Sequence, residues 1–228
     1  MRIRVVTYFW IFFSSIFSFN AYSGIILSGT RLIFNGNQNE TTITVTNPDK
    51  KSYLIQSWVS LDDKKSPDFI VTPPLFRIDG NMSNVLRIVL TKNTLSQDRE
   101  SLFWLNVKAI PPSDPDAKDT LLIAINTKIK LIYRPASLVG KDASDAYQEL
   151  IFKVDTKTQQ LVASNPTAYY INLANVTYNN NKIESPGIVA PFSNTKWSIK
   201  PTGAHNSVNW NAINDFGGIT STESQNIN

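Results

Sequence analysis

Apolar and polar residues alternate with a period of two along most of the chain, a pattern that indicates half-buried β-strands rather than helices. The runs are flanked by Pro, Asn, Asp or Ser, which favour turns. The predicted strands cover Ile25–Phe34, Thr41–Asn47, Tyr53–Leu61, a short segment near Phe69, Val85–Leu90, Leu102–Ala109 and Leu121–Tyr133. These roughly seven strands are typical of an immunoglobulin-like sandwich.

A second group of short strands follows Pro135, because a proline ends the hydrogen-bonded ladder of a strand. The alternation returns in Gln148–Val154 and Tyr169–Tyr178, with turns predicted at Asn165-Pro166-Thr167 and Asn179-Asn180-Asn181. The sequence therefore predicts an all-β chain with two immunoglobulin-like β-sandwich domains, residues 24–137 and 147–228, joined by a linker at 138–146. We expect the polar tail from Ile219 onward to fray.

The first residues have the composition of an export signal. Arg2 and Arg4 precede the apolar segment Val5–Phe19, and Ala21 and Ser23 supply the small residues of a signal-peptidase site. An uncleaved membrane anchor is the alternative, but about 15 apolar residues are fewer than the roughly 20 that a spanning helix needs. We therefore predict a signal peptide over residues 1–23 that is cleaved on export.

The amino-acid composition argues against several classes of function. The chain has 22 Lys and Arg against 18 Asp and Glu, a net charge of +4, without the basic run that a nucleic-acid-binding protein usually carries. Cysteine is absent and His205 is the one histidine, which excludes a Cys/His zinc site and thiol chemistry. His205 and the acidic pair Asp62 and Asp63 fall in predicted turns, so we expect no enzymatic activity.

The run that begins at Leu121 allows two interpretations. One of its faces carries Leu121, Ile123, Ile125 and Thr127. It is either a central strand whose alternate residues enter the core, or an edge strand whose apolar face adds a strand from another protein.

The basic residues near this strand also leave two interpretations open. Arg31 lies in the first strand, and Lys130 and Arg134 lie four residues apart in the long one. Converging cations would bind an anion, most simply a carboxylate, whereas separate ones would be solvated surface charges.

Several motifs occur in an order that identifies a family. They are Thr30-Arg31, Thr72-Pro73-Pro74, Leu95–Pro111, Thr127–Pro135 and Ile213–Gly218. Together they resemble the signature of the periplasmic pilus-assembly chaperones, the PapD-like family of the chaperone–usher pathway. The resemblance covers essentially the whole mature chain; Ser96 and the lack of a C-terminal cysteine pair depart from it. The short loop over residues 113–120 resembles the short F1–G1 loop subfamily.

The resemblance implies two domains set at an angle with a cleft between them. It places Arg31 and Lys130 where the family binds the C-terminal carboxylate of a pilus subunit. It places Glu100, Arg134 and Asp215 in an interdomain salt-bridge network, which makes Arg134 structural rather than ligand-binding. The donor strand, which fills the gap in the sandwich of the subunit, would use Leu121, Ile123, Ile125 and Thr127.

The implied function is that of a periplasmic chaperone, which binds fimbrial subunits, possible tip adhesins included, and delivers them to an outer-membrane usher. No bond is made or broken, so we expect no cofactor, and we expect no nucleic acid and no membrane insertion after signal cleavage. A self-capping dimer is compatible with this function. The alternative is a secreted carbohydrate-binding protein whose tryptophans stack on sugars, although we expect these to be core or domain-packing residues: Trp58, Trp104, Trp197 and Trp210.

Overall fold

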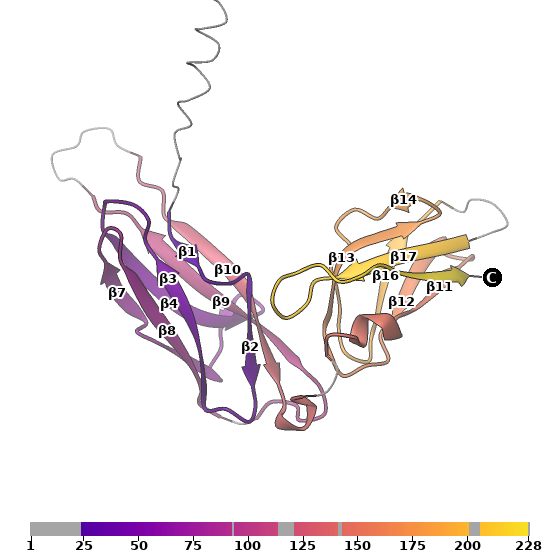
Figure 1. Cartoon of the computed structure of the whole chain (residues 1–228), viewed down its shortest axis with the longest axis horizontal. Helices are drawn as coiled ribbons and strands as arrows, with labels where there is room; N and C mark the ends of the chain where they lie inside the picture. Colours follow the sequence, from indigo (N-terminus) through magenta and orange to yellow (C-terminus); the bar gives the residue numbers. More distant parts are fainter. Residues whose placement is uncertain (1–23, 93, 114–120, 141–142, 201–205, 228) are drawn as a thin grey trace, which may run out of the picture.

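The computed structural model describes residues 24–92, 94–113, 121–140, 143–200 and 206–227. The predicted signal peptide, residues 114–120 of the predicted short loop, and His205 lie outside these residues. The described chain forms two β-lobes set at an angle to each other, as the sequence predicts (Figure 1). Within these residues, no helix is long and apolar enough to cross a membrane.

The first domain is a sandwich of two sheets. Its strands are β1 (Ile26–Leu27), β2 (Arg31–Asn35), β3 (Glu40–Thr46), β4 (Tyr53–Leu61), β5 (Lys64–Lys65), β6 (Phe69–Thr72), β7 (Leu75–Ile78), β8 (Ser83–Leu90), β9 (Ser101–Ile110) and β10 (Ile125–Arg134). One sheet has the order β1-β3-β8-β6, and the other has the order β2-β10-β9-β4-β5, with β7 also paired to β4. The strand Tyr53–Leu61 has the bounds that the sequence predicts.

Alternating residues of the two sheets fill the core of this domain. Phe34, Phe69 and Phe103 lie at its centre, and the ring of Phe69 contacts the other two edge-to-face at centroid distances of 5.5 and 4.9 Å. Such aromatic pairs contribute about 0.5–1.5 kcal/mol each beyond their buried area. The intervening residues of β9, such as Trp104 and Asn106, point to the opposite face of the sheet.

The predicted first strand, Ile25–Phe34, is in fact two strands in different sheets. β1 pairs with β3, and after Ser28–Thr30 the chain joins the other sheet as β2, which runs parallel to β10. The break includes Gly29, where a Cβ atom would lie 3.2 Å from the carbonyl oxygen of Arg31. Ser28, Gly29 and Thr30 interrupt the apolar pattern at this break, and the single predicted strand overlooked that interruption.

The predicted long strand Leu121–Tyr133 is also corrected, because β10 begins only at Ile125. Ile125 pairs with Ala109, near the end of β9, and Pro111 and Pro112 follow. A proline offers no N–H for the ladder, so residues 121–124 have no strand to pair with on that side.

The second domain is a smaller sandwich. Its strands are β11 (Ile151–Asp155), β12 (Gln160–Ser164), β13 (Ile171–Tyr178), β14 (Asn181–Lys182), β15 (Ile188–Val189), β16 (Asn194–Ser198), β17 (Asn206–Ala212) and β18 (Glu223–Ile227). One sheet has the order β11-β12-β16, and the other has the order β14-β13-β17-β18, with β15 paired to β13. Phe152 lies in the core between Trp210 and Trp197, at ring-centroid distances of 4.7 and 6.4 Å.

Two expectations for the second half are wrong. Gln148 and Glu149 belong to the 3-10 turn η2 (Ala146–Glu149), which follows η1 (Ala136–Leu138), and not to a strand. The polar tail does not fray over Glu223–Ile227, because β18 pairs with β17 and Ile227 is buried. The side-chain amide of Gln225 also accepts a hydrogen bond from the backbone N–H of Phe152 and donates one to its carbonyl, both at 2.9 Å.

The two Asn-Pro turns use the same device in the two domains. The side chains of Asn47 and Asn165 are buried, and each donates hydrogen bonds to three backbone carbonyls. Each amide oxygen accepts the backbone N–H of the residue two positions later. A buried side chain that satisfies several backbone groups fixes these turns more firmly than a solvated loop.

Candidate functional site: an open strand edge beside the interdomain cleft

β10 is a central strand along one half of its length and an edge strand along the other. Over Lys130–Arg134 it pairs with both β9 and β2. Over Ile125–Ile129 it pairs with β9, and the described residues place no strand on its other side. The long strand is therefore central over one half and lies at the edge of the sheet over the other. The open half presents unpaired backbone groups, which can accept an added strand.

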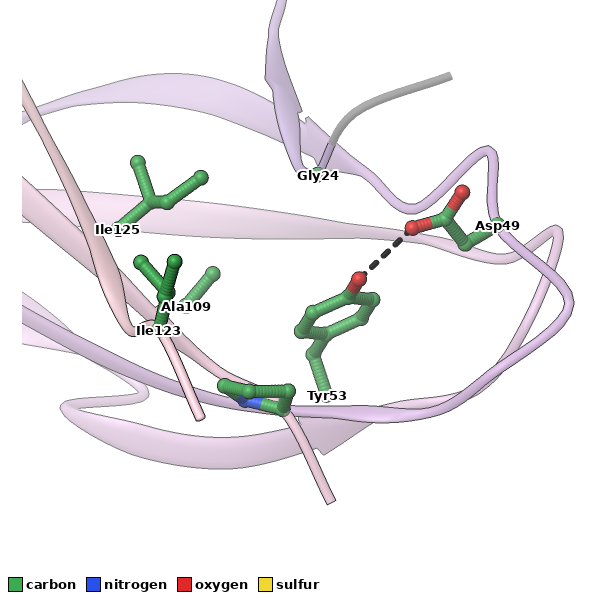
Figure 2. Close-up of a pocket in the computed structure, with 7 residues that line it drawn as sticks. Gly24, Asp49, Tyr53, Ala109, Ile123 and Ile125 are labelled. Atoms are coloured by element: carbon green, nitrogen blue, oxygen red, sulfur yellow. Dashed lines mark hydrogen bonds between the residues drawn. The ribbon is translucent and has the colours of Figure 1, made fainter. Parts of the chain in front are cut away.

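Apolar side chains lead into this open half. Leu121 is 82% exposed, Ile123 65% and Ile125 48%, whereas Ile129 is buried in the core. Thr127, between them, is half-buried. Ile123 and Ile125 flank a pocket of about 230 Å³, which indicates that they lie on the same side (Figure 2).

The far wall of this pocket is a feature that the sequence did not suggest. Figure 2 shows the ring of Tyr53 across from the two isoleucines, with its hydroxyl donating a hydrogen bond of 2.7 Å to Asp49 Oδ2. This hydrogen bond raises the pKa of Tyr53, and burial and the carboxylate charge act in the same direction. The polar groups of this wall thus satisfy each other. No sequence pattern marks Asp49 beyond its place in the Asn-Pro turn.

The open edge ends at two cations. Lys130 lies opposite Arg31 in the parallel register of β10 and β2, and both side chains are half-buried. Burial lowers the pKa of Lys130, and the Arg31 charge lowers it further. Burial also lowers the pKa of Arg31, while Asp215 raises it.

Arg31 retains unused hydrogen-bonding capacity. Its Nη1 donates a 2.9 Å hydrogen bond to the carbonyl of Ile213 in the second domain, but its buried Nε has no hydrogen-bond partner among the described residues. An unpaired donor beside a second, partly desolvated cation favours an anion, and a carboxylate matches the fork of a guanidinium.

Trp104 lies beneath the lysines of β10. Lys130 Nζ is 5.7 Å from the centroid of its ring and Lys128 Nζ is 5.0 Å away. Lys128 also forms an ion pair with Asp63 at 2.5 Å, which compensates its charge. Asp63 stays 86% exposed in this pair, and Lys130 forms no ion pair with a carboxylate of the described residues.

The structure brings Glu100, Arg134 and Asp215 together across the two domains. Arg134 Nε donates to Glu100 Oε1 at 2.7 Å, and its two terminal nitrogens donate to Asp215 at 2.7 and 3.1 Å. Glu100 Oε2 accepts the backbone N–H of Tyr170 at 2.7 Å. Burial raises the pKa of Glu100, although Arg134 opposes this shift. Arg134 thus has two carboxylate partners and little capacity for a ligand.

The tryptophans differ in their surroundings. Trp210 is buried and donates its Nε1–H to the carbonyl of Tyr147, and Trp197 donates to the carbonyl of Pro186 beside Phe152. These two residues belong to the core of the second domain. Trp58 and Trp104 lie half-buried on the outer face of the large sheet. Among the described residues, no group of three or more acidic or histidine side chains is placed to hold a metal ion.

Comparisons with known proteins point to one family. Residues 24–139 match the family model described as pili and flagellar-assembly chaperone, PapD N-terminal domain. Residues 145–224 match the model described as pili assembly chaperone PapD, C-terminal domain. The chain is 41% identical over 211 residues to the chaperone protein LpfB of Salmonella typhimurium, covering 90% of each protein. It is 40% identical over 205 residues to the chaperone protein FimC of Escherichia coli, covering 88% of this chain and 83% of FimC.

Solved structures of similar proteins indicate the same family. The crystal structure of the E. coli chaperone DraB has a TM-score of 0.78 at 35% identity, covering 90% of this chain and 96% of DraB. A chain in the structure of the Salmonella enterica SafA pilin in complex with the SafB chaperone has a TM-score of 0.79 at 36% identity. That match covers 91% of this chain and 98% of the other.

Proposed function

Because the chain belongs to the family of PapD-like pilus-assembly chaperones, we propose that it binds fimbrial subunits in the periplasm by lending them the open half of β10. The observation that carries this proposal is the strand itself. β10 has an unpaired edge over Ile125–Ile129, exposed apolar side chains at its start, and two half-buried cations at its inner end. Packing within the first domain alone does not account for these three features together.

The apolar side chains supply the gross binding energy. A pilin with an incomplete sandwich has a groove that Leu121, Ile123 and Ile125 can fill, and Thr127 completes the alternation. Each large side chain contributes about 1.5–3 kcal/mol when it is fully buried. Lost translational freedom and the ordering of residues before Ile125 offset much of this gain, so complementarity decides the affinity.

Arg31 and Lys130 fix the register. The terminal carboxylate of a pilin, bound between them, sets which pilin residue lies beside each position of the open edge. A shift by one residue would turn the apolar set to the wrong face, and a shift by two would offer the wrong side chains. Removing one cation from a desolvated clamp is expected to cost about 2–5 kcal/mol of binding free energy.

The salt-bridge network holds the two walls of this cleft together. Arg134 belongs to the donor strand and Asp215 to the second domain, so their ion pair ties the strand to the opposite wall. Glu100 extends this tie to the backbone of Tyr170. We assign the network a structural role that keeps the carboxylate site in shape.

The same proposal includes the partners and the compartment. The bound proteins are pilins, including a tip adhesin where the pilus has one, and the acceptor is an outer-membrane usher. A solved relative, SfaE, is described as a periplasmic chaperone, and the predicted signal peptide fits that compartment. The assignment to the short F1–G1 loop subfamily stays a prediction from the sequence.

The test is co-purification from a periplasm that is producing pili. We expect tagged wild-type protein to elute with stoichiometric pilin-sized partners, identified by mass spectrometry, and the Lys130→Ala variant to lose them. Lys153→Ala, an exposed lysine of β11 in the second domain, is the matched control and should keep the partners. If the partners remain with Lys130→Ala, the carboxylate clamp is wrong. If the wild type elutes alone, the chaperone function itself fails, and binding to a glycan column becomes the next experiment.

A further inference from the structure

Phe216 is almost wholly exposed. Its side chain is 98% accessible, more than Leu121 at 82%, which the donor strand presents to its partner. Phe216 lies in the loop Asn214–Gly218, between β17 and β18, and this loop reaches toward the first lobe (Figure 1). A single exposed apolar residue is common on protein surfaces, so exposure alone assigns Phe216 no role. Its place on an ordered loop beside the interdomain cavity is what makes it a candidate contact.

The loop is held in one conformation without any help from the Phe216 ring. The side chain of Asn214 accepts the backbone N–H groups of Phe216 and Gly218 at 3.0 and 2.9 Å. Backbone hydrogen bonds join Asn214 to Gly218 and to Gly217, and Asp215 holds Arg134 with two further hydrogen bonds. The conformational entropy of the loop is therefore lost before any partner binds, which suits an anchor residue.

The loop also forms one wall of the carboxylate site. Arg31 donates to the carbonyl of Ile213, just before the loop. A cavity between the domains is lined by Arg31, Arg134 and Asp215, among others. Gly217 lies against the first domain, because a Cβ atom there would be 2.8 Å from Thr30 Oγ1. Phe216 directly follows Asp215, which lines this cavity.

We propose that Phe216 is a second-domain anchor that contacts an apolar side chain at one of the last two positions of the bound pilin. This inference rests on the proposed function, since it takes the terminal carboxylate of the pilin to lie between Arg31 and Lys130. The final residues of that pilin lie between β10 and the loop Asn214–Gly218. Side chains alternate along an extended segment, so one of the last two points away from the first domain and toward the loop.

The dissociation rate of the chaperone–pilin complex tests the anchor. Complexes of the mature chaperone with a pilin are exchanged against excess labelled chaperone, and loss of the unlabelled partner is followed by size-exclusion chromatography. We expect Phe216→Ala to accelerate dissociation roughly tenfold, the effect of losing part of a buried aromatic contact. Ile70→Ala is the control, because Ile70 in β6 is 55% exposed and lies on the other sheet of the first domain.

A loss of folding stability is not expected to contribute to the effect of Phe216→Ala. The Phe216 ring is 98% exposed in the free protein, so Phe216→Ala should leave the thermal unfolding midpoint unchanged. A second arm uses a pilin whose last two side chains are replaced by alanine. On that pilin Phe216→Ala should have no further effect, because the proposed contact is already absent.

Each outcome has one meaning. A wild-type dissociation rate for Phe216→Ala overturns the anchor, and an effect that persists on the alanine-ended pilin overturns its placement at the end of the pilin chain. Loss of usher binding with unchanged pilin dissociation assigns Phe216 to the usher and overturns the inference. Lys130→Ala separates the two levels: if it abolishes the complex while Phe216→Ala has no effect, the proposed function stands and the anchor fails. If the wild type forms no complex, both fail.

Discussion

Removing the buried cation of the interdomain network should destabilise the protein in a pH-dependent way. Arg134→Met leaves Glu100, which is 2% exposed, without its counter-ion and leaves Asp215 without its two hydrogen bonds. Breaking a buried ion pair by removing one partner costs about 3–5 kcal/mol, because a charge stays buried and uncompensated. We expect a loss of this size in the free energy of unfolding at pH 7, measured by urea denaturation with tryptophan fluorescence.

The sign of the pH dependence follows from Glu100. Burial already raises its pKa, and Arg134 opposes this shift, so Arg134→Met raises the pKa further. A carboxyl whose folded pKa is raised contributes stability below its unfolded pKa, about 4.3, and loses it as pH rises toward the folded pKa. The deficit of Arg134→Met relative to wild type should therefore be small near pH 4 and grow toward pH 7.

Glu100→Gln provides the comparison. A glutamine side chain has one oxygen for two donors, Arg134 Nε and the N–H of Tyr170, and an unsatisfied buried donor costs about 1–3 kcal/mol. This variant should lose less stability than Arg134→Met and should not show its growing deficit, because residue 100 no longer titrates. A pH-independent deficit for Arg134→Met, or wild-type stability for both variants, would refute the reasoning.

Three further changes have expected outcomes. Burial and a neighbouring guanidinium lower the pKa of Lys130 in the free protein, so the affinity for a pilin should fall as the pH rises above neutrality, and Lys130→Arg should remove this dependence in equilibrium binding assays. Gln225→Ala removes both hydrogen bonds to the backbone of Phe152 and should cost about 1–3 kcal/mol in urea denaturation. Gly217→Ala combines a positive φ of 87° with a contact of 2.8 Å to Thr30 Oγ1, and calorimetry should show a loss of about 1 kcal/mol or more.

The sequence predicted a strand correctly where its apolar alternation and its flanking turn residues indicate the same bounds. Tyr53–Leu61 has the predicted bounds because its apolar alternation and its flanking turns coincide. Ile25–Phe34 was wrongly predicted as one strand, although Ser28-Gly29-Thr30 already separates its two apolar runs, which pair in different sheets. β18 was missed because Glu223–Ile227 is polar apart from its last residue, and pairing with β17 stabilises it rather than apolar burial along its length.

The candidate site could be predicted only in part, because some of its contacts join residues that are far apart in the sequence. The spacing of Lys130 and Arg134 first suggested one anion site, but the structure commits Arg134 to Glu100 and Asp215. The Asp215 partner is 81 residues away in the sequence, and no local pattern could indicate it. The contacts of Trp104 with the lysines likewise depend on the register of β9 and β10, which sequence periodicity does not determine. Asp49 and Tyr53 are only four residues apart, but no sequence pattern marked their hydrogen bond.

The two faces of the open half of β10 explain how an exposed edge stays specific. On the outer face, Asn126 donates to Asn106, which donates in turn to Ser60, and the neighbouring Lys128 is paired with Asp63. The inner face carries apolar residues that continue into the core at Ile129. An incoming strand therefore meets an apolar surface on one side alone and a charged, hydrogen-bonded one on the other. A pairing shifted by one residue would place apolar side chains against that polar face, so the edge resists unspecific strand addition while it remains open to a pilin in the correct register.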